Sequence, residues 1–118
     1  MSKFRFEDLE IWKLSMDIGD KLFDIADALE LKKLYRFAEQ LRGSGMSMSN
    51  NIAEGSGSTS NNEFKQYLNI ARRSKFENAN ILIILQRRKI IHENEKNILL
   101  DQLDLLCRKI TNFRNSLN

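Results

Sequence analysis

Few side chains in this sequence have the chemistry that catalysis or metal binding requires. His92 is the only histidine and Cys107 the only cysteine among the 118 residues. One chain therefore supplies neither the ligand set of a zinc site nor a cysteine–histidine nucleophile pair. Among the carboxylates, Glu54 is distinctive because small residues flank it, and its role stays open. We expect a protein that is not an enzyme and that binds no cofactor or metal.

Basic side chains are concentrated in one part of the chain. Residues 55–92 carry seven basic and two acidic side chains, whereas residues 1–31 carry four basic and eight acidic ones. Clustered arginine and lysine side chains attract phosphate groups, which indicates RNA or another nucleic acid as a partner. The same charges are also compatible with a solvated helix face that pairs with the acidic first segment. The candidate nucleic-acid-binding residues are Arg42, Lys65, Arg72, Arg73, Arg87 and Arg88.

Residues 43–62, GSGMSMSNNIAEGSGSTSNN, have the composition of a linker, since fourteen of the twenty are Gly, Ser or Asn. A phosphate-binding P-loop is disfavoured, because neither Gly45 nor Gly57 is followed by lysine and no predicted strand precedes either glycine. Apolar residues at helical spacing continue to about Ala53, which predicts a helix through the first half. The predicted loop is then GSGSTS at 55–60.

Small residues within this predicted helix indicate close packing. Glycine inside a helix costs about 1 kcal/mol relative to alanine, so Gly43 and Gly45 oppose the helix unless a neighbour packs closely. Gly45, Ser49 and Ala53 lie four residues apart and form a stripe that another helix, or a large ring such as Trp12 or Phe23, could approach closely. We name this stripe the close-contact groove. The predicted helix-packing residues are Gly45, Ser49, Asn51 and Ala53.

Polar residues lie beside the close-contact groove and at seam positions of the next helix. They are Ser47, Asn50, Asn51 and Glu54, together with Ser74, Lys75 and Asn78. One interpretation is a hydrogen-bond network that fixes the register of two helices, because each buried polar group needs a partner. The other interpretation is a polar pore or a ligand site.

The elements that position these residues follow from hydrophobic periodicity. No proline interrupts the chain, so long helices are permitted. Apolar residues recur at spacings of three and four in four segments, and the wide face of the first segment hints at burial against another subunit. The series are Leu9, Trp12, Met16, Gly19, Phe23 and Ala26 beside Ile11, Ile18, Leu22, Ile25 and Leu29; then Leu34, Leu41, Gly45, Met48 and Ile52; then Phe64, Tyr67, Leu68, Ala71, Ser74, Asn78, Ile81, Leu82 and Leu85; and last Leu99, Leu103, Leu106, Ile110, Phe113 and Leu117.

Turn and cap signals separate the later helices. Ser60 and Glu63 fit a capping box at the start of the third helix, and RRKIIHENE at 87–95 predicts a charged turn before the fourth. Helices of about 22 to 28 residues with short connections favour antiparallel neighbours. We predict an all-α fold, an antiparallel up-down-up-down four-helix bundle, as one domain over residues 1–118.

The sequence also predicts a compartment. Its longest apolar run is the five residues 81–85, whereas a membrane span needs about 20. The N-terminal MSKFRFEDLE lacks the apolar centre of a secretory signal, and a lone cysteine forms no internal disulfide. We therefore expect a cytoplasmic protein without a membrane partner.

Several motifs resemble one known family over nearly the whole chain. They are Phe6, Asp8, Leu9, Ile11 and Trp12, QLR at 40–42, NIAEG at 51–55, EF at 63–64, Leu68, IAR at 70–72, Ser74 and Glu77. With these motifs the chain resembles bacterial four-helix-bundle proteins that are encoded within intervening sequences of 23S ribosomal RNA genes. The resemblance implies a cytoplasmic ring-forming bundle, with a homopentamer as the form known in the family, and a link to RNA. It implies no catalytic residues. Gly43, Ser49 and Arg73 depart from the family pattern, which has arginine, proline and glycine there.

Two functions therefore stay open. The first is an oligomeric, nucleic-acid-associated adaptor that presents its basic residues to phosphates without reading sequence. The second is a protein-interaction scaffold, in which the basic residues pair with acidic ones on the first helix of a neighbouring copy.

Overall fold

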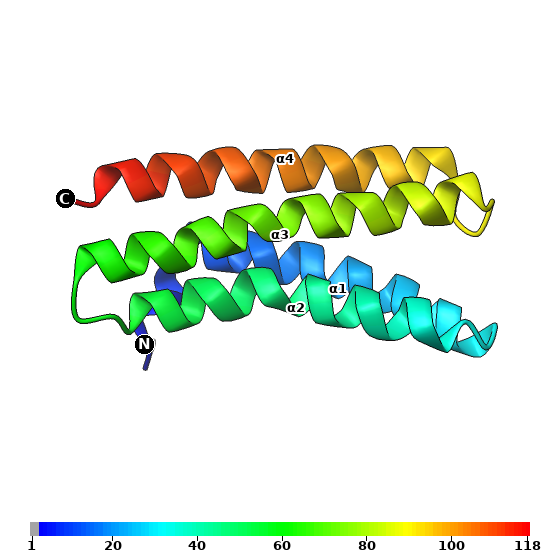
Figure 1. Cartoon of the computed structure of the whole chain (residues 1–118), viewed down its shortest axis with the longest axis horizontal. Helices are drawn as coiled ribbons and strands as arrows, with labels where there is room; N and C mark the ends of the chain where they lie inside the picture. Colours follow the sequence, from blue (N-terminus) through cyan, green and yellow to red (C-terminus); the bar gives the residue numbers. More distant parts are fainter. Residues whose placement is uncertain (1–2) are drawn as a thin grey trace.

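The computed structural model describes residues 3–118, which form four long α-helices and one short 3-10 helix (Figure 1). The 3-10 helix η1 covers Arg5–Asp8, and the α-helices are α1 (Glu10–Leu31), α2 (Tyr35–Ser56), α3 (Asn61–Arg87) and α4 (Glu93–Ser116). Consecutive helices run in opposite directions and are joined by short turns. The predicted all-α four-helix bundle is therefore confirmed.

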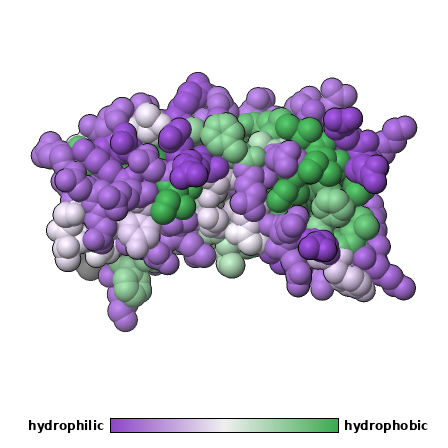
Figure 2. All heavy atoms as spheres, viewed as in Figure 1, coloured by the Kyte–Doolittle hydropathy of each residue, from purple (hydrophilic) through white to green (hydrophobic). Residues whose placement is uncertain are grey.

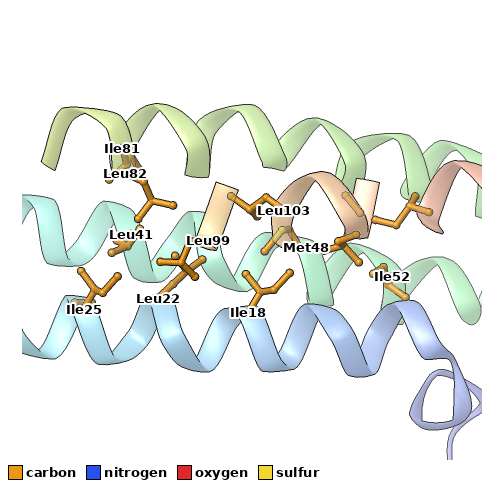
Figure 3. Packing of buried hydrophobic residues seen from close by; sticks show 14 of the residues in the cluster. Ile18, Leu22, Ile25, Leu41, Met48, Ile52, Ile81, Leu82, Leu99 and Leu103 are labelled. Atoms are coloured by element: carbon orange, nitrogen blue, oxygen red, sulfur yellow. The ribbon is translucent and has the colours of Figure 1, made fainter. Parts of the chain in front are cut away.

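The core extends along the bundle and receives side chains from all four helices (Figure 3). The predicted periodicity is confirmed in each helix, with one exception: Met16 is 37% exposed. The buried apolar residues are Ile11, Ile18, Leu22, Ile25, Ala26 and Leu29 of α1; Ala38, Leu41, Met48 and Ile52 of α2; Phe64, Leu68, Ala71, Ile81, Leu82 and Leu85 of α3; and Leu99, Leu103, Leu106 and Ile110 of α4.

Two equivalent C-terminal caps form the turns after α1 and α3. In these turns Lys33 and Lys89 have φ angles of 63° and 61°, in the left-handed region that glycine usually occupies. The Ile90 N–H donates to the Leu85 carbonyl at 2.9 Å, which satisfies a carbonyl at the end of α3, and the equivalent bond forms after Lys33. Ile90 then packs against the core, so the turn predicted at 87–95 contributes an apolar side chain as well as charges.

The connection from α2 to α3 corrects one prediction. Gly55 was expected to begin a loop, but it lies inside α2 and is buried. A Cβ at this position would be 2.7 Å from Tyr67 Cβ and 2.8 Å from Phe64 Cδ1, so glycine lets the start of α3 pack directly against α2. The chain therefore leaves the helix only at Gly57, and Ser60 caps α3 as predicted by accepting from the Glu63 N–H at 3.2 Å.

The small residues of α2 lie in a continuous helix, as predicted. Gly45 meets α1 closely, because its Cβ would lie 3.3 Å from Leu22 Cδ1 and its carbonyl oxygen lies 3.7 Å from the Cβ position of Gly19. Gly43 is different, since beyond its own helix backbone and chain neighbours no heavy atom of the described chain lies within 4 Å of its Cβ position. Close packing therefore explains Gly45 and does not explain Gly43.

A polar network joins α2 and α3, in agreement with the register-fixing interpretation. The Ser44 hydroxyl donates to Asn78 Oδ1 at 2.7 Å, and Asn78 Nδ2 donates to the Ser44 carbonyl at 3.0 Å. Farther along, Ser47 Oγ and Ser74 Oγ are 2.9 Å apart, and Asn51 Nδ2 donates to the Ser47 carbonyl at 2.7 Å. The other three predicted members lie elsewhere: Asn50 and Glu54 are exposed, and Lys75 binds Asp104 of α4.

Candidate nucleic-acid interface

The outward face of α3 and its C-cap residue Arg88 carry five of the six predicted basic residues. The buried positions of α3 recur at three- and four-residue spacing, so the residues between them point away from the core. Arg73, Arg87 and Arg88 are exposed, whereas Lys65 and Arg72 are half-buried. The distance along the helix from Lys65 to Arg87 is about 33 Å at 1.5 Å per residue. These five side chains, Lys65, Arg72, Arg73, Arg87 and Arg88, are named the basic face.

Within residues 3–118, no member of the basic face forms an ion pair with a carboxylate. Several other cations do: Lys75 Nζ lies 3.0 Å from an oxygen of Asp104, and Lys109 Nζ lies 2.6 Å from an oxygen of Glu10. Each lysine lowers the pKa of its carboxyl partner, mainly through the hydrogen bond. The charge of the basic face is therefore not neutralised by ion pairs within the described chain.

Pairing of the basic face with the acidic first helix does not occur within one chain. Helix α1 packs against α2 and α4, and no Cα atom of α1 lies within 8 Å of a Cα atom of α3. The two helices therefore lie diagonally across the bundle. If the basic face pairs with acids of an α1 helix, that helix would have to belong to another molecule.

Arg42, the sixth predicted basic residue, is not part of this face. Its guanidinium lies 2.6 Å from an Asp27 oxygen and 2.7 Å from a Glu30 oxygen, so it joins α2 to α1. The hydrogen bonds that Arg42 donates to Asp27 and to Glu30 raise the pKa of Arg42 above its usual value, the bond to Asp27 most. The sequence could not indicate this, because both partners lie more than ten residues away on another helix.

A groove between α2 and α3 adjoins the basic face. It includes Ser47 and Ser74, for which a ligand site was left open, but the part played by Phe76 was not predicted. It has a volume of about 540 Å³ and is lined by Ser47, Ile70, Arg73, Ser74, Phe76 and Glu77. Phe76 is 62% exposed and lies one helical turn from two arginines, Arg72 and Arg73. An aromatic residue outside the core series and within one turn of Arg72 and Arg73 is the sequence signal that could have indicated it.

The close-contact groove is an apolar depression between α1 and α2. Its volume is about 330 Å³, with Gly45, Ser49 and Ala53 of α2 opposite Gly19 of α1. The walls include the rings of Phe6, Trp12 and Phe23 and the side chains of Met16 and Met46. Asn51 is not part of the lining of this groove, and its amide donates to the Ser47 carbonyl one turn earlier in α2.

The residues weighed for catalysis are dispersed. His92 is exposed at the N-cap of α4 without a side-chain capping bond, Cys107 is a half-buried free thiol, and Glu54 is exposed. Among residues 3–118, no group of three or more His, Cys, Asp or Glu side chains is placed to hold a metal ion. None of the helices in this range combines the length and hydrophobicity needed to cross a membrane.

Comparison with known proteins identifies one family. The family model described as 23S rRNA-intervening sequence protein matches residues 7–112. This range includes the second half of η1, all of α1, α2 and α3, and most of α4. No curated protein matches the chain at a significant level.

Proposed function

Because the chain belongs to the 23S rRNA-intervening sequence protein family, we propose that it is a non-enzymatic, cytoplasmic, self-assembling bundle that associates with RNA through the basic face of α3. One observation carries this proposal: five cations gather along one face of α3 and its C-cap, and none of them has a carboxylate partner in the described chain.

The basic face suits the phosphate backbone better than it suits base sequence. Its charges extend along about 33 Å of helix, a length that can follow several successive phosphates. Arginine binds phosphate through two parallel N–H donors, and three exposed arginines (Arg73, Arg87 and Arg88) contribute here. Phosphate contacts carry no sequence information, so this association does not discriminate among sequences.

Self-association uses a different surface in this proposal. The close-contact groove is apolar and lies between α1 and α2, whereas the basic face points outward from α3. A second copy that fills the groove would leave the basic face open to RNA. The resemblance implies a closed ring, with a homopentamer as the expected form.

A second function, the protein-interaction scaffold, is favoured by exposed apolar side chains on α3. Ile70, Ile83 and Ile84 are 45%, 39% and 36% exposed. Figure 2 shows hydrophobic surface gathered toward the end of the bundle that holds the α1–α2 and α3–α4 turns, with hydrophilic surface around it. In this alternative the basic face contacts exposed acids on α1 of a neighbouring copy, among them Asp20.

Charge reversal separates the two functions. The test compares Arg72→Glu/Arg73→Glu with Lys13→Glu/Lys21→Glu, a control that makes the same change in net charge on α1. RNA retention is measured by a pull-down, and the oligomer by size exclusion with light scattering. The proposal predicts that only the α3 variant loses RNA while its oligomer stays intact. Dissociation of the α3 variant with RNA binding absent in the wild type would instead support the scaffold.

A further inference from the structure

Phe76 has an environment unlike that of the other exposed apolar residues of α3. Its ring is 62% exposed, and it follows Arg72 and Arg73 by one helical turn. The Lys75 ammonium lies 5.5 Å from the ring centroid, and Asp104 of α4 holds that ammonium at 3.0 Å. The cation is thus fixed on the α4 side of the ring. The α2–α3 groove lies on the other side of α3, with Phe76 as part of its lining.

Two polar groups of this groove already have hydrogen-bond partners within the protein, and two can still bind a ligand. Ser74 Oγ donates to the Ile70 carbonyl at 3.1 Å, so the 2.9 Å contact between the serines uses the Ser47 hydroxyl as donor. Both hydroxyl hydrogens are therefore occupied within the protein. Arg73 remains as a cationic donor and Glu77 as an anionic acceptor at the groove.

We propose that the α2–α3 groove binds an unpaired nucleobase, which stacks on Phe76 while its flanking phosphates contact Arg72 and Arg73. This inference rests on the proposed RNA association and names the class of RNA: single strands rather than duplexes. Stacking on an aromatic ring tolerates every base, because each base has a π-face. Glu77 accepts from an amino or imino N–H at the base edge, and this edge is already paired in a duplex.

The charges favour a nucleic acid over a protein segment as the occupant. An apolar peptide would bury Phe76, but it would also have to cover Arg72, Arg73 and Glu77 without neutralising them. A nucleotide has both the flat apolar surface for the ring and the negative charge for the arginines. The groove volume of about 540 Å³ lies within the range of about 300 to 1,000 Å³ that is usual for small-molecule clefts.

The test measures fluorescence anisotropy with an unstructured RNA strand of about 12 nucleotides and with the duplex it forms with its complement. The wild type is expected to bind the strand more tightly than the duplex. Phe76→Ala is expected to weaken strand binding by about 5- to 150-fold and to leave duplex binding unchanged. Phe76→Trp is the matched control: it should keep the preference, and its indole emission should be quenched by the strand. Circular dichroism checks that the exposed substitution leaves the fold intact.

The outcomes separate this inference from the proposed function. If Arg72→Glu/Arg73→Glu abolishes binding of both RNAs while Phe76→Ala leaves their affinity ratio unchanged, stacking is refuted and RNA association stands. If the wild type binds neither RNA at low salt, both are refuted. If Phe76→Ala dissociates the oligomer, the ring belongs to a protein interface and the inference is overturned.

Discussion

Replacing the three α2 glycines by alanine, one at a time, should give a graded series of stabilities. The sites differ in the space that a methyl group would find. Beyond the local helix backbone and chain neighbours, the Cβ position of Gly43 has no heavy atom of the described chain within 4 Å. That of Gly45 has Leu22 Cδ1 at 3.3 Å, and that of Gly55 has Tyr67 Cβ at 2.7 Å. Gly43 and Gly45 lie in the interior of α2 and Gly55 lies in its last turn, so alanine gains at most about 1 kcal/mol of helix propensity at each site and packing sets the order of the series.

The magnitude at Gly55 follows from two opposing terms. Alanine gains about 1 kcal/mol of helix propensity. Overpacking costs about 1 to 3 kcal/mol, and the upper value applies because Tyr67 Cβ is fixed to the backbone and the Phe64 ring is buried. Gly55→Ala should therefore destabilise the protein by about 2 kcal/mol. At Gly43 only propensity acts, so Gly43→Ala should stabilise by about 1 kcal/mol.

Gly45→Ala should fall between the other two, near zero. The nearest atom is the end of the flexible Leu22 side chain, which can move by a few tenths of an ångström. Urea unfolding, followed by circular dichroism at one protein concentration, measures the three free energies of unfolding. A Gly55→Ala variant as stable as Gly43→Ala would refute the direct contact between α2 and the start of α3.

Three further predictions concern caps, buried polar groups and pH. Lys89→Gly should stabilise by about 1 kcal/mol by removing the strain of a left-handed residue, whereas Lys89→Ala should not; equal thermal stabilities of the two variants would contradict the cap geometry. Asn78→Ala should destabilise by about 1 to 3 kcal/mol in urea unfolding, because it leaves Ser44 without its buried partner, and an unchanged midpoint would show that the network does not stabilise the bundle. The stability difference between wild type and Asp104→Asn should vanish in acid. Lys75 lowers the folded-state pKa of Asp104, so the ion pair stabilises the fold above the unfolded-state pKa of about 4, and this stabilisation is lost as the pH falls through the folded-state pKa. A stability difference that grows in acid would contradict the ion pair.

The helices and most of the core could be predicted from sequence because their signal is local. Periods of three and four place Ile18, Leu22, Leu82 and Leu103 on buried stripes without any knowledge of the neighbours. The serine cap at Ser60 is local for the same reason. The close packing at Gly45 could also be predicted, because glycine within a helical pattern indicates a close neighbour.

Features that depend on contacts between helices were harder to predict. Composition places Gly55 in a loop, and only the rings of α3 packed against it show why it stays helical. Arg42 has the same chemical type as Arg73, but two carboxylates of α1 bind it. Phe76 was not predicted because it lies outside the apolar series that marks the core side of α3. Its exposure depends on how the four helices pack. Gly43 has no packing explanation in the structure.

The salt dependence of RNA affinity tests the central claim most directly. Each phosphate contact contributes about −0.7 to the slope of log affinity against log salt for a single strand, so the five cations of the basic face predict a slope of about −3.5. Removing two charges with Arg72→Gln/Arg73→Gln should make the slope shallower, about −2, whereas Lys13→Gln/Lys21→Gln on α1 should leave the slope unchanged. A slope near zero in the wild type, or equal slopes in the two double variants, would contradict RNA binding by the basic face.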